Sequence, residues 1–251
     1  NFSKASASVL ENTVGLWQTI SKYDIDQDGD DDYLVGNLVL NSKYSVSGKS
    51  SFHIYCDDFD QNGNYDIVLS STYQNVLVPI RGRQCSSEQM PFIKDKFKTY
   101  DLFAKATVSD IIGADELEGA LHFEADILAS VYVENLGTGS FKITPLPNEA
   151  QISTINDFVF TDIDNDQNKE ILSVGNLFTT EVETPRLDGS FGHAMRFSNG
   201  EFEVMPSGKS GLLANIDARD LQLIKLGNNT MILVTVNNGP LQLYKVANEF
   251  L

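Results

Sequence analysis

The sequence lacks three features that would each define a class of protein. No apolar run among its 251 residues reaches the 18 residues that a membrane-spanning helix needs. Basic residues are few, 18 against 35 acids, and the net charge of −17 argues against nucleic acid or anionic lipid as the main partner. The only two cysteines, Cys56 and Cys85, lack CxxC spacing, so they fit either a disulfide or two separate thiols.

Recognisable catalytic motifs are also missing. The three histidines lie far apart in sequence with no HExxH motif, and no GxSxG occurs. Gly208-Lys209-Ser210 resembles the end of a phosphate-binding loop, but Glu203 stands where the first glycine belongs, which favours an ordinary turn. Arg81, Arg83 and Arg186 on expected loops either read a ligand carboxylate or form structural ion pairs. A binding or structural role is favoured over catalysis.

Acidic residues are abundant and clustered. Three short segments, 24–32, 57–66 and 162–170, contain 14 of the 35 acids. An acid excess that only improves solubility would be spread along the chain. At the same time, 41% of residues are apolar, with 15 Phe and 9 Tyr, which excludes a disordered chain. The three acidic segments are therefore the place to look for chemistry.

The three segments align as a nine-residue repeat. Each has oxygen-bearing side chains at alternating positions, an apolar residue at position 2, an aromatic-rich segment before it and a short apolar run after it. This pattern predicts a strand, an acidic loop and a second strand. The candidate ligands are Asp24, Asp26, Asp28, Asp30 and Asp32; Asp58, Asp60, Asn62, Asn64 and Asp66; and Asp162, Asp164, Asp166, Asn168 and Glu170.

Alternating oxygen donors around a tight loop are typical of Ca²⁺ sites. The residue at position 12 is Val35, Leu69 or Ser173, not the glutamate of an EF-hand. Mg²⁺ fits less well because it prefers fewer carboxylates and more water. Glycine at position 6 permits the sharp turn in the first two loops, whereas the third has Gln167 there. We expect two calcium sites and a third, weaker one.

Short strands dominate the rest of the chain. Seven further strand-like segments lie between residues 127 and 246, punctuated by Gly and Asn. Asparagine closes several strands, at Asn37, Asn135, Asn176 and Asn237. Repeated strand units with loops on one face predict an all-β fold, specifically a β-propeller of about five blades or a segment of a larger one. We expect one propeller domain over residues 1–251.

One stretch departs from this pattern. Residues 88–106 place Ile93, Phe97, Tyr100 and Ala104 at helical spacing, after Pro91 at a favourable first position. A second short helix is expected within 108–120. We interpret 88–120 as a helical insertion between blades that packs its apolar stripe, including Tyr100, inward. The alternative is a docking helix for a partner.

The three loops, each followed by an apolar strand and in two cases by Gly-Asn, resemble FG-GAP/VCBS repeats. Such repeats form propeller blades in integrin α-chain heads and bacterial surface proteins. The ending, 215–241, resembles the last repeat of propellers that accompany ASPIC/UnbV domains. The resemblance implies calcium at the matching loop positions, with Gln167 and Glu170 departing from the consensus; segment 84–125 is not typical of a blade.

The resemblance also implies a location outside the cell, secreted or at the cell surface. The start, NFSKASASVL, has no signal-peptide pattern, so we expect either a removed leader or an excerpt of a longer, outer-membrane-anchored protein. The expected function is a non-catalytic, calcium-stabilised module that binds a protein or glycan, or a subunit of a cell-surface assembly. The alternative is a propeller-based polysaccharide lyase or hydrolase.

Overall fold

The computed structural model describes residues 2–4, 9–11, 13–46, 50–227 and 229–246. Strands hold 39% of the residues against 15% in helices, and the four sheets are antiparallel, which confirms the all-β expectation. The chain divides into a larger unit, from the described residues of 1–12, 16–43 and 128–251, and a smaller unit of 13–15 and 44–127. No helix in the described ranges is long and apolar enough to cross a membrane.

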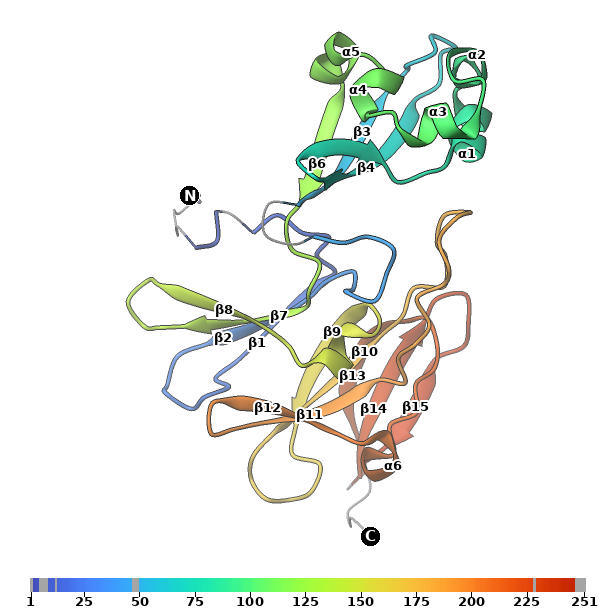
Figure 1. Cartoon of the computed structure of the whole chain (residues 1–251). Coiled ribbons are helices and arrows are strands. Elements are labelled where there is room, and N and C mark those ends of the chain that lie inside the picture. Colours follow the sequence, from blue (N-terminus) through green and yellow to red (C-terminus); the bar gives the residue numbers. More distant parts are fainter. Residues whose placement is uncertain (1, 5–8, 12, 47–49, 228, 247–251) are drawn as a thin grey trace. The chain divides into compact units, whose positions relative to one another are not determined.

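The larger unit contains three sheets, in which neighbouring strands are also consecutive in the chain except for β2 and β7, whose sequences are separated by the smaller unit (Figure 1). The first sheet has β1 (Thr19–Tyr23), β2 (Asp32–Gly36), β7 (Val131–Asn135) and β8 (Phe141–Pro145); the second has β9 (Ile155–Thr161), β10 (Glu170–Gly175), β11 (His193–Ser198) and β12 (Glu201–Met205); the third has β13 (Ala218–Leu226), β14 (Asn229–Val236) and β15 (Gln242–Lys245). A 3-10 turn, η1 (Asn148–Gln151), precedes β9, and α6 (Ser207–Ser210) follows β12. The seven strands expected after residue 127 are thus confirmed, although the first begins later than expected.

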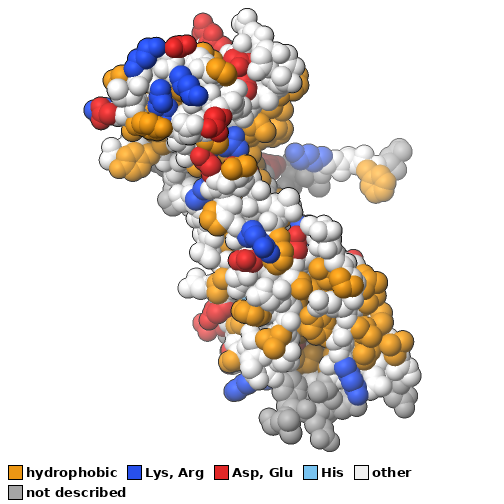
Figure 2. Space-filling view, turned by 90° about the vertical axis from the view of Figure 1, so that its right-hand side faces the viewer, with side chains coloured by type: hydrophobic (Ala, Val, Ile, Leu, Met, Phe, Trp, Pro, Cys, Tyr) orange, Lys and Arg blue, Asp and Glu red, His pale blue; other side chains and the backbone are white. Residues whose placement is uncertain are grey.

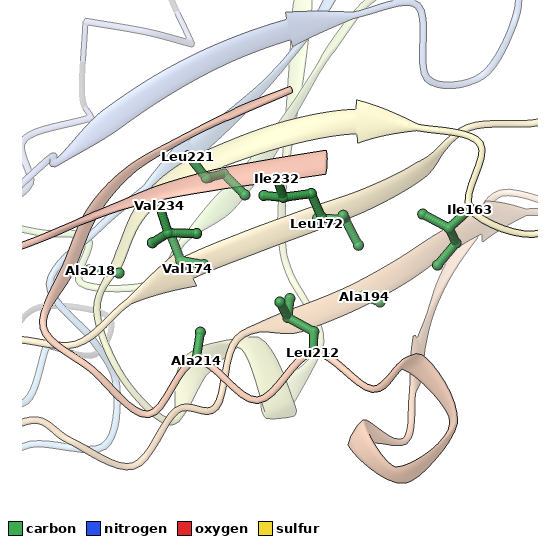
Figure 3. Packing of buried hydrophobic residues seen from close by; sticks show 10 residues of the cluster. All are labelled: Ile163, Leu172, Val174, Ala194, Leu212, Ala214, Ala218, Leu221, Ile232 and Val234. Atoms are coloured by element: carbon green, nitrogen blue, oxygen red, sulfur yellow. The ribbon is translucent and has the colours of Figure 1, made fainter. Parts of the chain in front are cut away.

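The second sheet is covered on both faces. All six residues of β10 are buried. Alternate side chains of a strand point to opposite faces of the sheet, so both faces of β10 are covered. Ile171 enters a core that contains Leu34 and Tyr132 of the first sheet. Leu172 enters another core, with Leu221 of the third sheet (Figure 3). The three sheets therefore pack face to face in the order in which the chain forms them.

The smaller unit has one sheet, with strands in the order β5, β4, β3, β6, and five short helices. Its elements are β3 (Phe52–Asp57), β4 (Asp66–Tyr73), β5 (Val76–Pro79), α1 (Arg83–Gln89), α2 (Phe92–Lys96), α3 (Tyr100–Ala104), α4 (Val108–Ile111), α5 (Ala114–Gly119) and β6 (Leu121–Ala125). The expected insertion, 88–120, is thus one part of the smaller unit, which has its own sheet and its own apolar core. Cys56 and Cys85 are half-buried thiols.

The expected helix over 88–106 is three short helices. The chain leaves the helical conformation at Phe97 and starts again at Thr99, whose hydroxyl accepts a hydrogen bond from the Leu102 amide at 3.2 Å. This break changes the phase of the apolar stripe. Ile93 is buried, but the expected inward orientation of Tyr100 is wrong, since it is 62% exposed. Figure 2 shows basic and acidic side chains interspersed on the visible surface of the smaller unit.

The Gly175-Asn176 pair after the third loop meets two requirements of the packing around it. A Cβ at Gly175 would lie 1.7 Å from the carbonyl oxygen of Thr154, so only glycine lets the two backbones approach. The side chain of Asn176 is buried. Its Nδ2 donates to the backbone carbonyl of Ser190 at 2.9 Å, and its Oδ1 accepts from the backbone N–H of Ser190 at 3.0 Å. Asn37 in the pair after β2 is likewise buried, and the expectation that asparagines close these strands is confirmed.

Candidate metal centres

Each acidic loop joins two neighbouring antiparallel strands. The loops connect β1 to β2, β3 to β4, and β9 to β10, which confirms the predicted strand, loop, strand unit. Position 9 is the first residue of the second strand in all three hairpins: Asp32, Asp66 and Glu170. The same sequence pattern therefore produces the same local structure three times.

The three loops also share one set of four hydrogen bonds. The position 9 carboxylate accepts from the amide of position 2 at 2.9–3.1 Å, and the position 1 carboxylate accepts from the amide of position 6 at 2.8–3.2 Å. Position 3 accepts from the amide of position 5, and position 5 from that of position 7. These bonds hold the side-chain oxygens inward, as in Asx turns.

Carboxylates at positions 1, 3 and 9 converge in each loop. One oxygen from each lies within 4.8 Å of the other two, which makes each cluster able to hold a metal ion. The clusters are Asp24, Asp26 and Asp32; Asp58, Asp60 and Asp66; and Asp162, Asp164 and Glu170. The candidate acids at positions 5 and 7, Asp28, Asp30 and Asp166, lie outside these clusters. Asn62, Asn64 and Asn168 take part in the hydrogen bonds of their loops.

The position 9 carboxylates are almost fully buried, with exposed fractions of 0%, 2% and 1%. Burial and nearby carboxylates raise the pKa of Asp26 in the first loop and of Asp66 in the second. Burial is the larger cause in both groups, and the neighbouring carboxylates act in the same direction. A bound divalent cation would supply a compensating positive charge.

Two buried oxygens of the first loop have no hydrogen-bond partner. They are Oδ1 of Asp24 and Oδ1 of Asp30. Lys22, on the strand before this loop, forms its ion pair with Asp31, which is not among the candidate ligands. Buried acceptors of this kind are normally satisfied by a donor, a water or a cation. The donor set of this loop, hard oxygens only, fits Ca²⁺.

The third loop has its own cation. The Arg196 guanidinium on β11 forms an ion pair with Asp164, and its Nε donates to Oε1 of Glu170 at 3.0 Å. Burial raises the pKa of Glu170, and the bond from Arg196 acts in the opposite direction. Two of the three converging carboxylates thus already have a positive partner. Gln167 lies in the left-handed region at φ 75°, the strain expected from the missing glycine.

Sequence reasoning missed two features of these loops. Position 4, which is Gln27, Gln61 or Asn165, also has positive φ in each loop. Arg196 could not be found from local spacing, because it reaches the loop from the next strand of the sheet. The three arginines considered as ligand readers are held by the protein itself: Arg81 donates to the Ile67 carbonyl, Arg83 donates to the Phe97 carbonyl, and Arg186 lies over the ring of Phe178.

A pair of carboxyl groups also lies in contact outside the acidic loops. Asp157 on β9 and Asp220 on β13 share a hydrogen bond, and the Leu221 amide donates to Asp157 at 3.0 Å. Burial, together with the bond to Asp220, raises the pKa of Asp157 to about 6. The same bond lowers the pKa of Asp220. Asp157 is therefore the proton-holding member of the pair.

Replacing Arg196 tests its role as the cation of the third loop. Arg196→Gln leaves Glu170 buried without its charged partner, so the metal-free protein is expected to lose about 1–3 kcal/mol of stability. Ca²⁺ should restore more stability in this variant than it adds to the wild type. Urea unfolding in EDTA and in Ca²⁺ measures both effects. The exposed Lys225→Gln on β13 is the control, expected to change stability by about 0.5 kcal/mol or less; an unchanged Arg196→Gln in EDTA contradicts the assignment.

The Asp157–Asp220 pair predicts that Asp157→Asn stabilises the folded protein by an amount that depends on pH. With its raised pKa, folded Asp157 binds a proton between about pH 4 and 6 while the unfolded chain does not, so its contribution to stability falls as pH rises through this window. The side-chain N–H of an asparagine at this position supplies the hydrogen-bond donor in place of that proton at every pH. The variant should melt above the wild type at pH 7.5, with a gain that shrinks as the pH falls and vanishes below about pH 4. Thermal unfolding with exposed Asp188→Asn as control checks this, and a gain independent of pH contradicts it.

Comparisons with known proteins add no relative to these observations. No protein-family model matches the chain, and neither a curated protein nor a solved structure is significantly similar to it. The resemblance to FG-GAP/VCBS repeats therefore stays a prediction from the loop sequences.

Proposed function

We propose that the protein is a non-catalytic, calcium-stabilised binding module of the cell exterior. The observation that carries this proposal is the threefold recurrence of one loop, with the same four hydrogen bonds and the same converging carboxylates. Ca²⁺ is the ion of choice because every candidate donor is a hard oxygen. Modules outside the cell tolerate weak sites, since Kd values there run to about 10⁻⁴–10⁻³ M.

We further propose that the larger unit is an arc of a β-propeller of the FG-GAP/VCBS kind. Three antiparallel sheets that follow one another in the chain and pack face to face support this interpretation. The outer face of the third sheet carries exposed Leu226 and Leu243, as expected of a blade at the end of an arc. The smaller unit contains one more hairpin with the same loop.

A hollow beside the first loop supports a binding role. It has a volume of about 820 Å³, within the usual range of ligand sites, and lies between the first and second sheets. Three mutually packed aromatic rings, Tyr132, Phe197 and Phe202, line it together with polar side chains that include Gln27 and Lys142. Apolar rings beside hydrogen-bonding groups suit a sugar, so we favour a cell-surface glycan over a protein as the ligand.

A polysaccharide-degrading enzyme is the second candidate. The observation that favours it is the Asp157–Asp220 pair, because a carboxyl with a raised pKa can act as a general acid. Neither residue lines the hollow, which weakens this candidate. Release of reducing or unsaturated ends from acidic polysaccharides, lost in Asp157→Asn, would establish it.

Calcium removal tests the stabilising role of the loops. EDTA should lower the melting temperature, and Ca²⁺ should restore it better than Mg²⁺, since a ligand at a hundredfold excess over Kd adds about 2.7 kcal/mol. Asp26→Asn and Asp60→Asn should each remove part of the Ca²⁺ response. Asp31→Asn, an acid of the first loop outside the cluster, is the matched control and should keep it. Melting curves that are identical in EDTA and Ca²⁺ contradict the calcium proposal.

The hollow gives a separate test of the glycan proposal. Phe202→Ala removes an aromatic wall and should abolish the binding that the wild type shows on a glycan array. Ile20→Ala, which removes an exposed apolar side chain elsewhere on the larger unit, should leave binding unchanged. Melting temperatures of both variants establish that they are folded. Absence of any bound glycan for the wild type in Ca²⁺ contradicts the proposal.

A further inference from the structure

Two of the three histidines meet on the sheet of the smaller unit. His53 on β3 pairs with Glu124 on β6, and Tyr55 pairs with His122 in the same register. Residues two apart in a strand point to the same face. His53, His122 and Glu124 therefore share one face of the sheet, although the first two are separated by the whole helical segment.

The nitrogen and oxygen atoms of this group converge on one point. Nδ1 of His53 lies 3.0 Å from Nε2 of His122 and 3.6 Å from Oε2 of Glu124. One such atom from each residue lies within 4.8 Å of the other two. The two ring nitrogens face each other closely, so at most one of them can carry a hydrogen in the neutral pair.

Packing fixes the rings, and one side of the group stays open. The Tyr55 ring stacks on His122 with centroids 4.4 Å apart and an interplanar angle of 6°. The His53 side chain is 15% exposed, whereas that of Glu124 is 44% exposed. Among the described strands, β6 lies at the edge of its sheet and pairs with β3. A ligand from solvent can therefore reach the three donor atoms.

We infer that His53, His122 and Glu124 form a binding site for a divalent transition-metal ion, with Zn²⁺ as its preferred occupant. Two imidazole nitrogens and one carboxylate oxygen are a donor set of open zinc sites, in which the fourth position is taken by water or an added ligand. Nitrogen donors separate this site from the acidic loops, whose oxygens suit harder ions. It does not depend on the proposed calcium sites, because it uses none of their residues.

The protonation state of His53 is compatible with this role. Burial and the neighbouring His122 lower its pKa, while Glu124 and Asp126 act in the opposite direction. A neutral imidazole at pH 7 is the form that binds a metal. The competing interpretation is a hydrogen-bonded pair of imidazoles that binds no ion.

Imidazole ¹H–¹⁵N spectra distinguish the two interpretations. Zn²⁺ is titrated at pH 7.5 into the tag-free full chain, in excess Ca²⁺ so that the acidic loops do not compete. We expect the His53 and His122 signals to shift together and to saturate at one equivalent. His193, on β11 in the larger unit beside Ser173, is the internal control and should not shift. Absent shifts for His53 and His122, or equal shifts for all three histidines, overturn the inference.

Two variants assign the ligands. His122→Gln and Glu124→Gln should each weaken Zn²⁺ binding by more than about tenfold, since even the loss of an outer-shell partner costs that much. Glu118→Gln, which removes an equal charge from an exposed position of the same unit, should bind like the wild type. Metal-free melting temperatures show that each variant is folded. Unchanged Zn²⁺ affinity in both ligand variants, measured by calorimetry in excess Ca²⁺, overturns the inference.

Discussion

The mutual repulsion of three carboxylates at the base of a hairpin is the constraint on which this structure depends. In the first loop, Asp32 shows why the repulsion is built in. Its carboxylate accepts hydrogen bonds from the Ile25 amide, the Tyr132 hydroxyl at 2.9 Å and the Asn135 amide at 2.9 Å, so it joins the loop to β7 as well as closing it. Such a residue cannot move away from Asp24 and Asp26. The local fold therefore requires a positive charge at this point.

The chain meets this requirement in two ways. The candidate ligands of the first and second loops are only acids and amides, and we propose that a bound ion supplies the positive charge there. The third loop receives Arg196 from the neighbouring strand, and the guanidinium takes the position of a cation beside Glu170. A permanently charged side chain needs no metal in solution. In the larger unit, one hairpin is thus expected to depend on calcium and the other to be self-sufficient.

Local spacing in the sequence was enough to predict the hairpins, the turn residues and the converging carboxylates, because all of them are set within nine residues. The same reasoning failed where distant segments meet. Arg196 and the His53–His122 pair depend on strand register across intervening chain, and Tyr100 was misplaced because Thr99 restarts the helix in a new phase. The stacking of three sheets follows from β10, which is buried on both faces, because its adjacent residues Ile171 and Leu172 enter two different cores.

The central claim, that the first two loops are calcium sites and the third is neutralised by arginine, is tested most directly by a crystal structure grown in millimolar Ca²⁺. We predict an ion in each of the first two loops, about 2.3–2.6 Å from carboxylate oxygens of positions 1, 3 and 9. We predict that Arg196 still contacts Asp164 and Glu170 in the third. Water alone in the first two loops, with their carboxylates turned apart, would contradict the account.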